Sequence, residues 1–216
     1  MSSPPLRICR RWLAGGAVLA LAGCASLLVS NPPGNLYRLM AARDFPPDLR
    51  PVRTQLMVDL PQAPAGIDKD RIALSKSPLM LDYFANSEWT DRLPELIENL
   101  LLASFENSGA IIAVDRNSGG LRADYILRTE IRHFEAIYTS ANTPPQVWVE
   151  IIARLAAVRQ RAIIAETRFE KRVPATANDI PAIVAAFNTA TVGVLRDIVL
   201  WTLTNPALSR SQSSGT

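Results

Sequence analysis

The chain has 216 residues, with 23 lysines and arginines, 20 aspartates and glutamates, one histidine and two cysteines. An apolar fraction of 48% beside 20% charged residues excludes a disordered chain, and two cysteines are too few for a disulfide scaffold. The length suits one ordinary domain with its own hydrophobic core.

Residues 1–23 have the composition of an export signal. They contain no acidic residue, carry three arginines near the start, and then run apolar and small from Trp12 onward. The apolar run is shorter than the ~20 residues that a membrane-spanning helix needs. Residues 21–24 read Leu-Ala-Gly-Cys, which resembles the lipobox of bacterial lipoproteins, where the cysteine thiol is lipidated.

The lipobox resemblance implies that residues 1–23 are removed and that acylated Cys24 holds the protein on a membrane. Residue 25 is Ala rather than the Asp that is typical of inner-membrane retention, so we expect the periplasmic face of the outer membrane. Residues 24–35, with two prolines and a glycine, are expected to form a lipidated tether. Loss of the signal removes three arginines and no acid, so the net charge of +3 disappears and no nucleic-acid partner is expected.

Short strands are predicted first, followed by a helix. The strand segments are residues 35–40, 55–60, 71–74 and 80–84. A helix is predicted from Leu93 to Phe105, because apolar residues recur there with the spacing of one helix face. Thr90 or Asp91 is its expected cap and Gly109 its expected end. A further strand is expected at residues 111–115.

Three longer segments alternate with a period of two, at residues 125–132, 147–158 and 163–172. In the first and third, apolar side chains alternate with charged ones, so each strand buries one face and leaves a charged face in water. The middle segment is apolar on both faces in places, with Trp148 and Ile152 on the second face. We interpret it as a central strand, or as one whose outer face is covered by a partner.

A second apolar-faced helix is expected after Asn178 or Asp179, either of which can cap it, and before Asn205-Pro206. The globular domain is then residues 36–205, and residues 206–216, polar from Ser209 on, are predicted to be a disordered tail. The order of elements predicts an α+β fold. We expect a two-layer sandwich of a mixed, largely antiparallel sheet with two helices on one face.

No catalytic site, metal site or cofactor is expected. His133 is the only histidine of the chain, and no cysteine lies near it in the sequence at a spacing typical of metal ligands. We therefore interpret it as a hydrogen-bonded or partly exposed strand histidine. The carboxylates are scattered without the pairing that hydrolysis needs. Residues 118–120, Ser-Gly-Gly, are interpreted as a turn rather than a phosphate-binding loop.

Four side chains are candidates for partner binding. Tyr83 and Trp89 belong, with Phe84, to the densest aromatic cluster of the chain, and both core packing and an exposed anchor are open for them. Trp148 and Ile152 share the outer face of the predicted middle strand. An exposed apolar face there indicates a subunit contact.

Several segments resemble the ABC-type transport auxiliary lipoprotein family, the group that includes paraquat-inducible protein C. They are residues 37–39, 66–73, 81–89, 123–127 and 133–136. The resemblance covers most of the chain after Cys24. It implies a domain similar to the amino-terminal domain of TolB, and a role in moving phospholipids or other hydrophobic molecules between membranes.

The family resemblance also implies partners, namely an MCE-domain protein and inner-membrane transporter components. Some relatives form a homo-oligomeric ring that receives the end of an MCE tube. Two other functions stay open: a lipid-binding lipoprotein with a cavity between sheet and helices, and a lipoprotein activator of a cell-wall enzyme. A hydrolase is the least favoured function, because no nucleophile, base and orienting residue can be assembled.

Overall fold

The computed structural model describes residues 34–117, 122–140 and 143–210. The export signal, Cys24, the Ser-Gly-Gly turn and the end of the tail all lie outside these ranges. Within them the chain forms eight strands and three helices. The strands are β1 (Asn35–Tyr37), β2 (Val52–Val58), β3 (Arg71–Ser77), β4 (Met80–Trp89), β5 (Ile111–Arg116), β6 (Tyr125–Ile137), β7 (Gln146–Ala157) and β8 (Ala162–Pro174). The helices are α1 (Leu93–Ser108), α2 (Ile180–Leu203) and α3 (Pro206–Arg210).

Strand β6 is the centre of one mixed sheet. On one edge it pairs antiparallel with β7 along its whole length, and β7 pairs antiparallel with β8. Its other edge is shared, because β2 pairs in parallel with its first residues and β3 pairs in parallel with its last. Beyond β2 lies β5, and beyond β3 lie β4 and then β1. The expected mixed sheet with mainly antiparallel long strands is confirmed.

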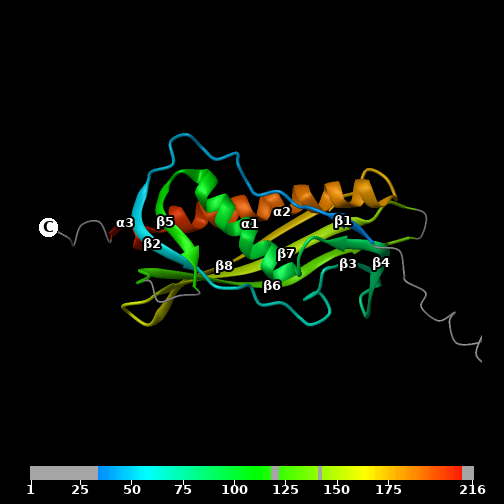
Figure 1. Ribbon diagram of the computed structural model, residues 1–216, viewed down its shortest axis with the longest axis horizontal. Helices are drawn as coiled ribbons and strands as arrows, with labels where there is room; N and C mark the ends of the chain where they lie inside the picture. Colours follow the sequence, from blue (N-terminus) through cyan, green and yellow to red (C-terminus); the bar gives the residue numbers. More distant parts are fainter. Residues whose placement is uncertain (1–33, 118–121, 141–142, 211–216) are drawn as a thin grey trace, which may run out of the picture. The chain divides into compact units, whose positions relative to one another are not determined.

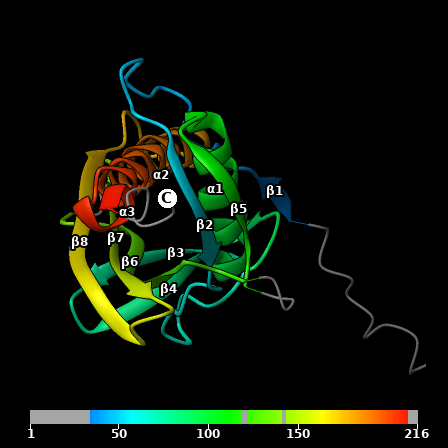
Figure 2. The same ribbon diagram turned by 90° about the vertical axis from the view of Figure 1, so that its left-hand side faces the viewer.

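Helices α1 and α2 cover one face of the sheet (Figures 1 and 2). Helix α2 packs along β7 and β8, and α1 packs against α2, β5 and β2. The α+β two-layer arrangement is therefore confirmed. By length and composition α2 could also cross a membrane, but half of its most apolar stretch is buried inside the fold.

The structure shows which residues cap helices α1 and α2. The Asp179 carboxylate accepts a hydrogen bond from the backbone N–H of Ala182 at 2.8 Å, which confirms one of the two caps expected for α2. Gly109 ends α1 in the left-handed region with φ of 61°, as expected for a helix-ending glycine. The cap predicted for α1 is wrong: Arg92 holds that position and its side chain makes no capping hydrogen bond.

An aromatic cluster fills the space between the helices and the sheet. The Trp89 ring lies 5.3 Å from the Phe187 ring and 6.0 Å from the Phe134 ring, centroid to centroid, and Phe134 and Phe187 are 5.2 Å apart. All three side chains are almost completely buried, Trp89 with 2% of its surface exposed. Trp89 is therefore a core residue, and its prediction as a partner-binding side chain is wrong.

A β-bulge in β6 changes which side chains face the core. The register with β7 shifts between Ile131 and His133. Before the shift the odd-numbered side chains of Leu127 and Ile131 are buried, and after it the even-numbered side chain of Phe134 is buried. His133, which a regular alternation would turn inward, therefore faces away from the helices.

The expected disordered tail begins instead with helix α3. Leu208 is fully buried, and the Tyr125 hydroxyl donates a hydrogen bond to the Ala207 carbonyl at 2.8 Å. These contacts attach residues 206–208 to the domain, so the domain extends beyond the predicted boundary at residue 205.

Candidate partner interface

The surface of interest is the face of β6, β7 and β8 that points away from the helices, which we call the outer face. Alternation in β7 places Val147, Val149 and Ile151 in the core and turns Trp148 and Ile152 outward. Their cross-strand neighbours on β6 and β8 are charged: Glu135 and Arg172 for Trp148, and Glu130 and Arg168 for Ile152. The strand predicted to be apolar on both faces is thus a central strand with a half-buried outer surface.

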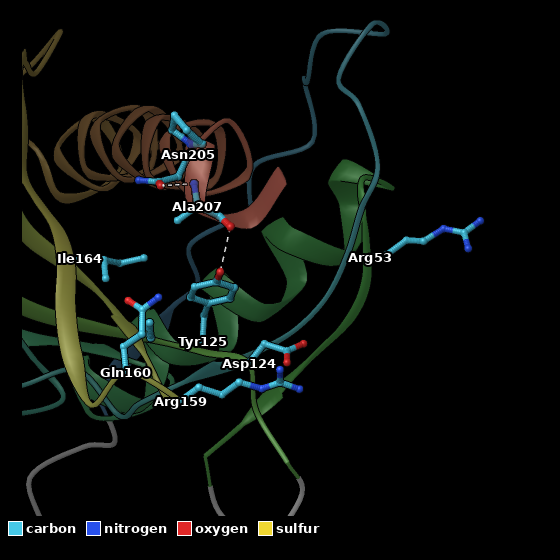
Figure 3. A pocket seen from close by; sticks show the side chains of 10 residues that line it. Arg53, Asp124, Tyr125, Arg159, Gln160, Ile164, Asn205 and Ala207 are labelled. Atoms are coloured by element: carbon cyan, nitrogen blue, oxygen red, sulfur yellow. Dashed lines mark hydrogen bonds between the residues drawn. The ribbon is translucent and has the colours of Figure 1, made fainter. Parts of the chain in front are cut away.

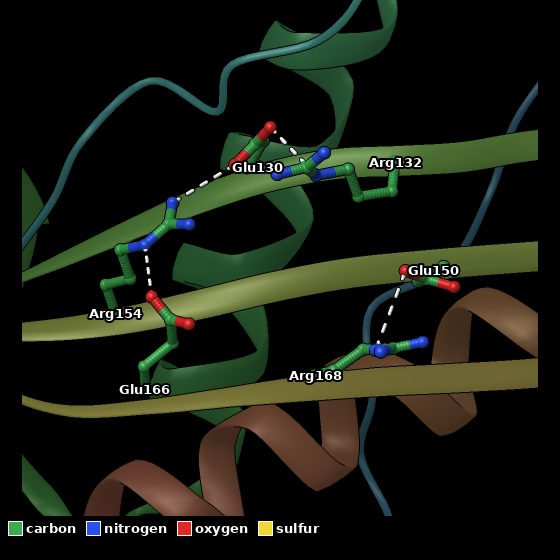
Figure 4. A network of polar contacts seen from close by, with 6 residues as sticks. All are labelled: Glu130, Arg132, Glu150, Arg154, Glu166 and Arg168. Atoms are coloured by element: carbon green, nitrogen blue, oxygen red, sulfur yellow. Dashed lines mark hydrogen bonds and ion pairs between the residues drawn. The ribbon is translucent and has the colours of Figure 1, made fainter.

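A chain of ion pairs runs across the three strands (Figure 4). On β6, the Glu130 carboxylate pairs with the Arg132 guanidinium at 2.8 Å and with the Arg154 guanidinium at 3.1 Å. Arg154, on β7, also pairs with Glu166 on β8 at 2.5 Å. Hydrogen bonds to Glu166 and then to Glu130 raise the pKa of the Arg154 guanidinium. Arg154 is therefore a permanent cation that links carboxylates on the two neighbouring strands.

Ile152 lies inside this charged region. Its cross-strand neighbours are Glu130 on one side and Arg168 on the other. Arg168 also approaches Glu150, which is 7% exposed, at 3.8 Å. An apolar side chain between ion-paired neighbours has the layout of an interface core with a polar rim.

Trp148 lies in a stack of three planar groups. The His133 ring lies 3.3 Å from the Trp148 ring, centroid to centroid and nearly parallel, and the Arg172 guanidinium lies 4.0 Å from the Trp148 ring centroid. His133 Nδ1 is 2.9 Å from the Glu135 carboxylate, which confirms the interpretation of a hydrogen-bonded strand histidine. The buried Trp148 Nε1 has no hydrogen-bond partner among the described residues.

Tyr83 lies beside the outer face rather than on it. It is half-buried, its hydroxyl donates to the Gly66 carbonyl at 2.7 Å, and Arg71 lies 4.3 Å from its ring centroid. Tyr83 lines a groove of about 650 Å³, and Trp148 lines a neighbouring groove of about 760 Å³. The two grooves share Lys76, Tyr138 and Thr139, so the fold brings Tyr83 and Trp148 onto adjoining surfaces.

A third depression, of about 710 Å³, lies at the end of the sheet near α3 (Figure 3). Asp124 is part of it, but its carboxylate already accepts from the Gln55 backbone N–H at 3.0 Å. Arg53 extends away from the other labelled side chains in Figure 3. The polar groups of this depression do not converge on one point, so it suggests no particular chemistry.

We searched the described residues for groups of side chains that could bind a metal ion. Within residues 34–117, 122–140 and 143–210, no three His, Cys, Asp or Glu side chains come together in a way that could hold a metal ion. The charged side chains of the outer face named above are instead ion-paired with one another.

Sequence reasoning correctly placed Trp148 and Ile152 on the second face of the strand but missed the stack around Trp148. That stack depends on the bulge at Arg132, which turns His133 outward. The sequence did carry a signal for the bulge, because the apolar positions change from odd to even between Ile131 and Phe134. A change of phase of this kind is typical of a β-bulge.

The fold places the chain among α+β domains with a mixed sheet. The crystal structure of protein XCC0632 from Xanthomonas campestris, of family DUF330, is similar with a TM-score of 0.75 and 28% identity, covering 83% of this chain and 99% of that one. The crystal structure of a second, uncharacterized protein has a TM-score of 0.61 at 15% identity, covering 78% and 97% of the two chains, and shows the fold alone.

The chain belongs to the family of ABC-type transport auxiliary lipoprotein components, whose model it matches over residues 37–199. That family is described as an auxiliary lipoprotein component of ABC-type transport, and it is not a known enzyme family. An uncharacterized protein of Bradyrhizobium diazoefficiens is 27% identical over 193 residues, which cover 85% of this chain and 49% of that relative. The chain thus spans about half the length of this curated relative.

Proposed function

We propose that the protein is a non-enzymatic auxiliary subunit of an ABC/MCE-type system that moves lipids or other hydrophobic molecules between the inner and outer membranes. Acylated Cys24 anchors it to the periplasmic face of the outer membrane. Copies of the chain form a homo-oligomeric ring, which docks an MCE-domain protein linked to inner-membrane transporter components. The family match over residues 37–199 carries the proposal, and the Leu-Ala-Gly-Cys sequence at 21–24 supports the anchor.

The outer face is the surface that we assign to these contacts. Trp148 and Ile152 give it a half-buried apolar centre, and the ion pairs of Glu130, Arg154 and Glu166 give it a polar rim. Tryptophan and arginine are the residues most enriched among the energetically dominant positions of protein interfaces. Tyr83, on the adjoining groove, is proposed to extend the same contact.

The alternative of a lipid held between sheet and helices receives no support from the fold. The Trp89, Phe134 and Phe187 rings occupy that space at contact distance. A cavity for an acyl chain would require these side chains to move apart.

The proposal is tested by crosslinking in intact cells. A photoreactive amino acid replaces Ile152 on the outer face, and the matched control carries it at Ala185, an exposed position of α2 on the helical side. We expect position 152 to form adducts with an MCE-domain protein and with a second copy of the chain, identified by mass spectrometry. Position 185 is expected to form neither.

Two results would remove parts of the proposal. A monomeric mass in detergent, with no MCE-domain protein recovered alongside the tagged chain, would remove the ring and the docking. Adducts that form from position 185 but not from position 152 would place the contact on the helical side. The mass of the mature amino-terminal peptide tests acylation of Cys24 separately.

A further inference from the structure

The turn between β3 and β4 exposes three consecutive apolar side chains. Leu79 is 99% exposed, Met80 52% and Leu81 39%. We call residues Pro78 to Leu81 the hairpin tip. Single exposed apolar residues are ordinary on a protein surface, but three in succession at the end of a hairpin form a continuous apolar patch.

The hairpin tip has a fixed backbone. Ser77 and Met80 pair across the turn, and Pro78 occupies the second turn position, which its ring geometry favours. The Ser75 hydroxyl lies 2.7 Å from the Ser77 carbonyl oxygen and 3.0 Å from the Met80 carbonyl oxygen, so it can donate to either. The backbone of the hairpin tip is therefore ordered before any binding, so little conformational entropy is lost when its apolar side chains make contact.

The surface around the hairpin tip suits a lipid headgroup region. The tip forms one wall of the 760 Å³ groove whose other walls include Trp148 and Ile137. Lys76 lies at the base of the tip. Two carboxylates adjoin the tip and already have partners: Glu135, which lines the same groove, lies 2.9 Å from His133 Nδ1, and Asp82 accepts a hydrogen bond from the Tyr83 backbone N–H at 2.8 Å. Exposed apolar residues beside a cation are typical of elements that rest in the membrane interface.

The position of the hairpin tip allows it to reach a membrane that holds Cys24. Gly34 follows Cys24 by ten positions in the sequence, and a fully extended chain of ten residues spans up to ~35 Å. Asn35 pairs with Ser87, seven residues along β4 from Met80, which is about 23 Å at the rise of a strand. The tether is long enough for anchor and tip to meet the same surface.

We propose that the hairpin tip inserts into the headgroup and acyl boundary of the lipid bilayer, with Lys76 facing the lipid phosphates. The inference rests on the lipid anchor of the proposed function. It gives the domain a second point of contact with the bilayer, which fixes the orientation of the outer face relative to the membrane.

The test uses the full chain with Leu79→Cys, processed and acylated in cells. Mass spectrometry first establishes the acylation of Cys24, which leaves residue 79 as the free thiol for an environment-sensitive NBD dye. The labelled protein is reconstituted into vesicles of phosphatidylethanolamine and phosphatidylglycerol, with and without lipid that carries a doxyl quencher on its acyl chain. Asp48→Cys is the matched control, because Asp48 is exposed and also follows a proline at the second position of a turn.

We expect the dye at position 79 to show blue-shifted emission and a loss of intensity with the doxyl lipid, and the dye at position 48 to show neither. Unchanged emission at position 79 would overturn the proposal. A blue shift without lipid quenching would also overturn it, because the tip would then be buried against protein. Acylation and insertion are reported by different measurements, so a failure of the anchor and a failure of the tip are told apart.

Discussion

Two tryptophans of the same sheet have opposite surroundings. Trp89 lies between Phe134 and Phe187 in the core, whereas Trp148 lies between His133 and Arg172 on the outer face. The first is held by apolar packing and the second by stacking against polar planar groups. Apolar rings thus close Trp89 off from solvent, whereas the polar neighbours of Trp148 leave part of its surface exposed.

The largest expected effect on stability comes from the buried tryptophan, Trp89. Trp89→Ala removes a fully buried ring, and we expect it to lower the free energy of unfolding by about 3–5 kcal/mol. Urea denaturation followed by circular dichroism measures the change. A loss below ~1 kcal/mol would contradict the central role of Trp89 in the core.

Trp148→Ala tests the contribution of the outer face to stability and to the partner contact. Because the ring is only half-buried and stacks on polar groups, we expect a loss of about 1 kcal/mol in the same assay. We also expect the crosslinks from position 152 to disappear. Trp148→Phe, which keeps a flat ring, is the control and should retain part of the crosslinking. Unchanged crosslinking in the alanine variant would separate Trp148 from the partner contact.

Arg154→Met tests the rim of the outer face. The side chain is 27% exposed and joins Glu130 and Glu166, so we expect the free energy of unfolding to fall by about 0.5 kcal/mol at low salt. The difference should shrink in 1 M NaCl, where the Debye length is about 3 Å. A difference that is unaffected by salt would contradict an electrostatic contribution of Arg154 to stability.

The smallest expected effect concerns Tyr138, which lines both grooves beside the outer face. Burial raises the pKa of its hydroxyl above the ordinary value of 10.0, so the folded state keeps this proton to higher pH than the unfolded state. The free energy of unfolding should therefore fall as the pH rises above about 10. Tyr138→Phe should reduce that fall, as measured by denaturation at a series of alkaline pH values. An identical pH profile in the variant would assign the fall to other groups.

Much of the fold could be predicted because its elements have clear periods. The long strands β6, β7 and β8 alternate cleanly, and the helix that begins at Ile180 has a carboxylate cap in the sequence directly before it. Local patterns of this kind depend on residues that are close in the chain. Helix α3 was missed because it has only five residues, and its attachment depends on the burial of Leu208 and on a hydrogen bond from Tyr125, which is distant in sequence.

The roles of the two tryptophans could not be predicted for a different reason. The neighbours of Trp89 come from β6 and α2, the second of them almost 100 residues away in sequence. The neighbours of Trp148 depend on a one-residue bulge in an adjacent strand. Both environments are set by long-range pairing, which a sequence pattern does not specify.

Helix α2 raises a question of biogenesis. A chain exported before it folds would carry this 24-residue apolar segment through a translocation channel, where such segments tend to be released into the bilayer. Arg196 and Asp197 oppose that release, since a charge at the centre of a membrane helix costs about 2.5 to 3.5 kcal/mol. In the folded domain Arg196 donates to the Asp44 carbonyl at 2.6 Å and Asp197 pairs with Lys171 at 2.8 Å. The same two charges that dock the helix thus favour its passage across the membrane.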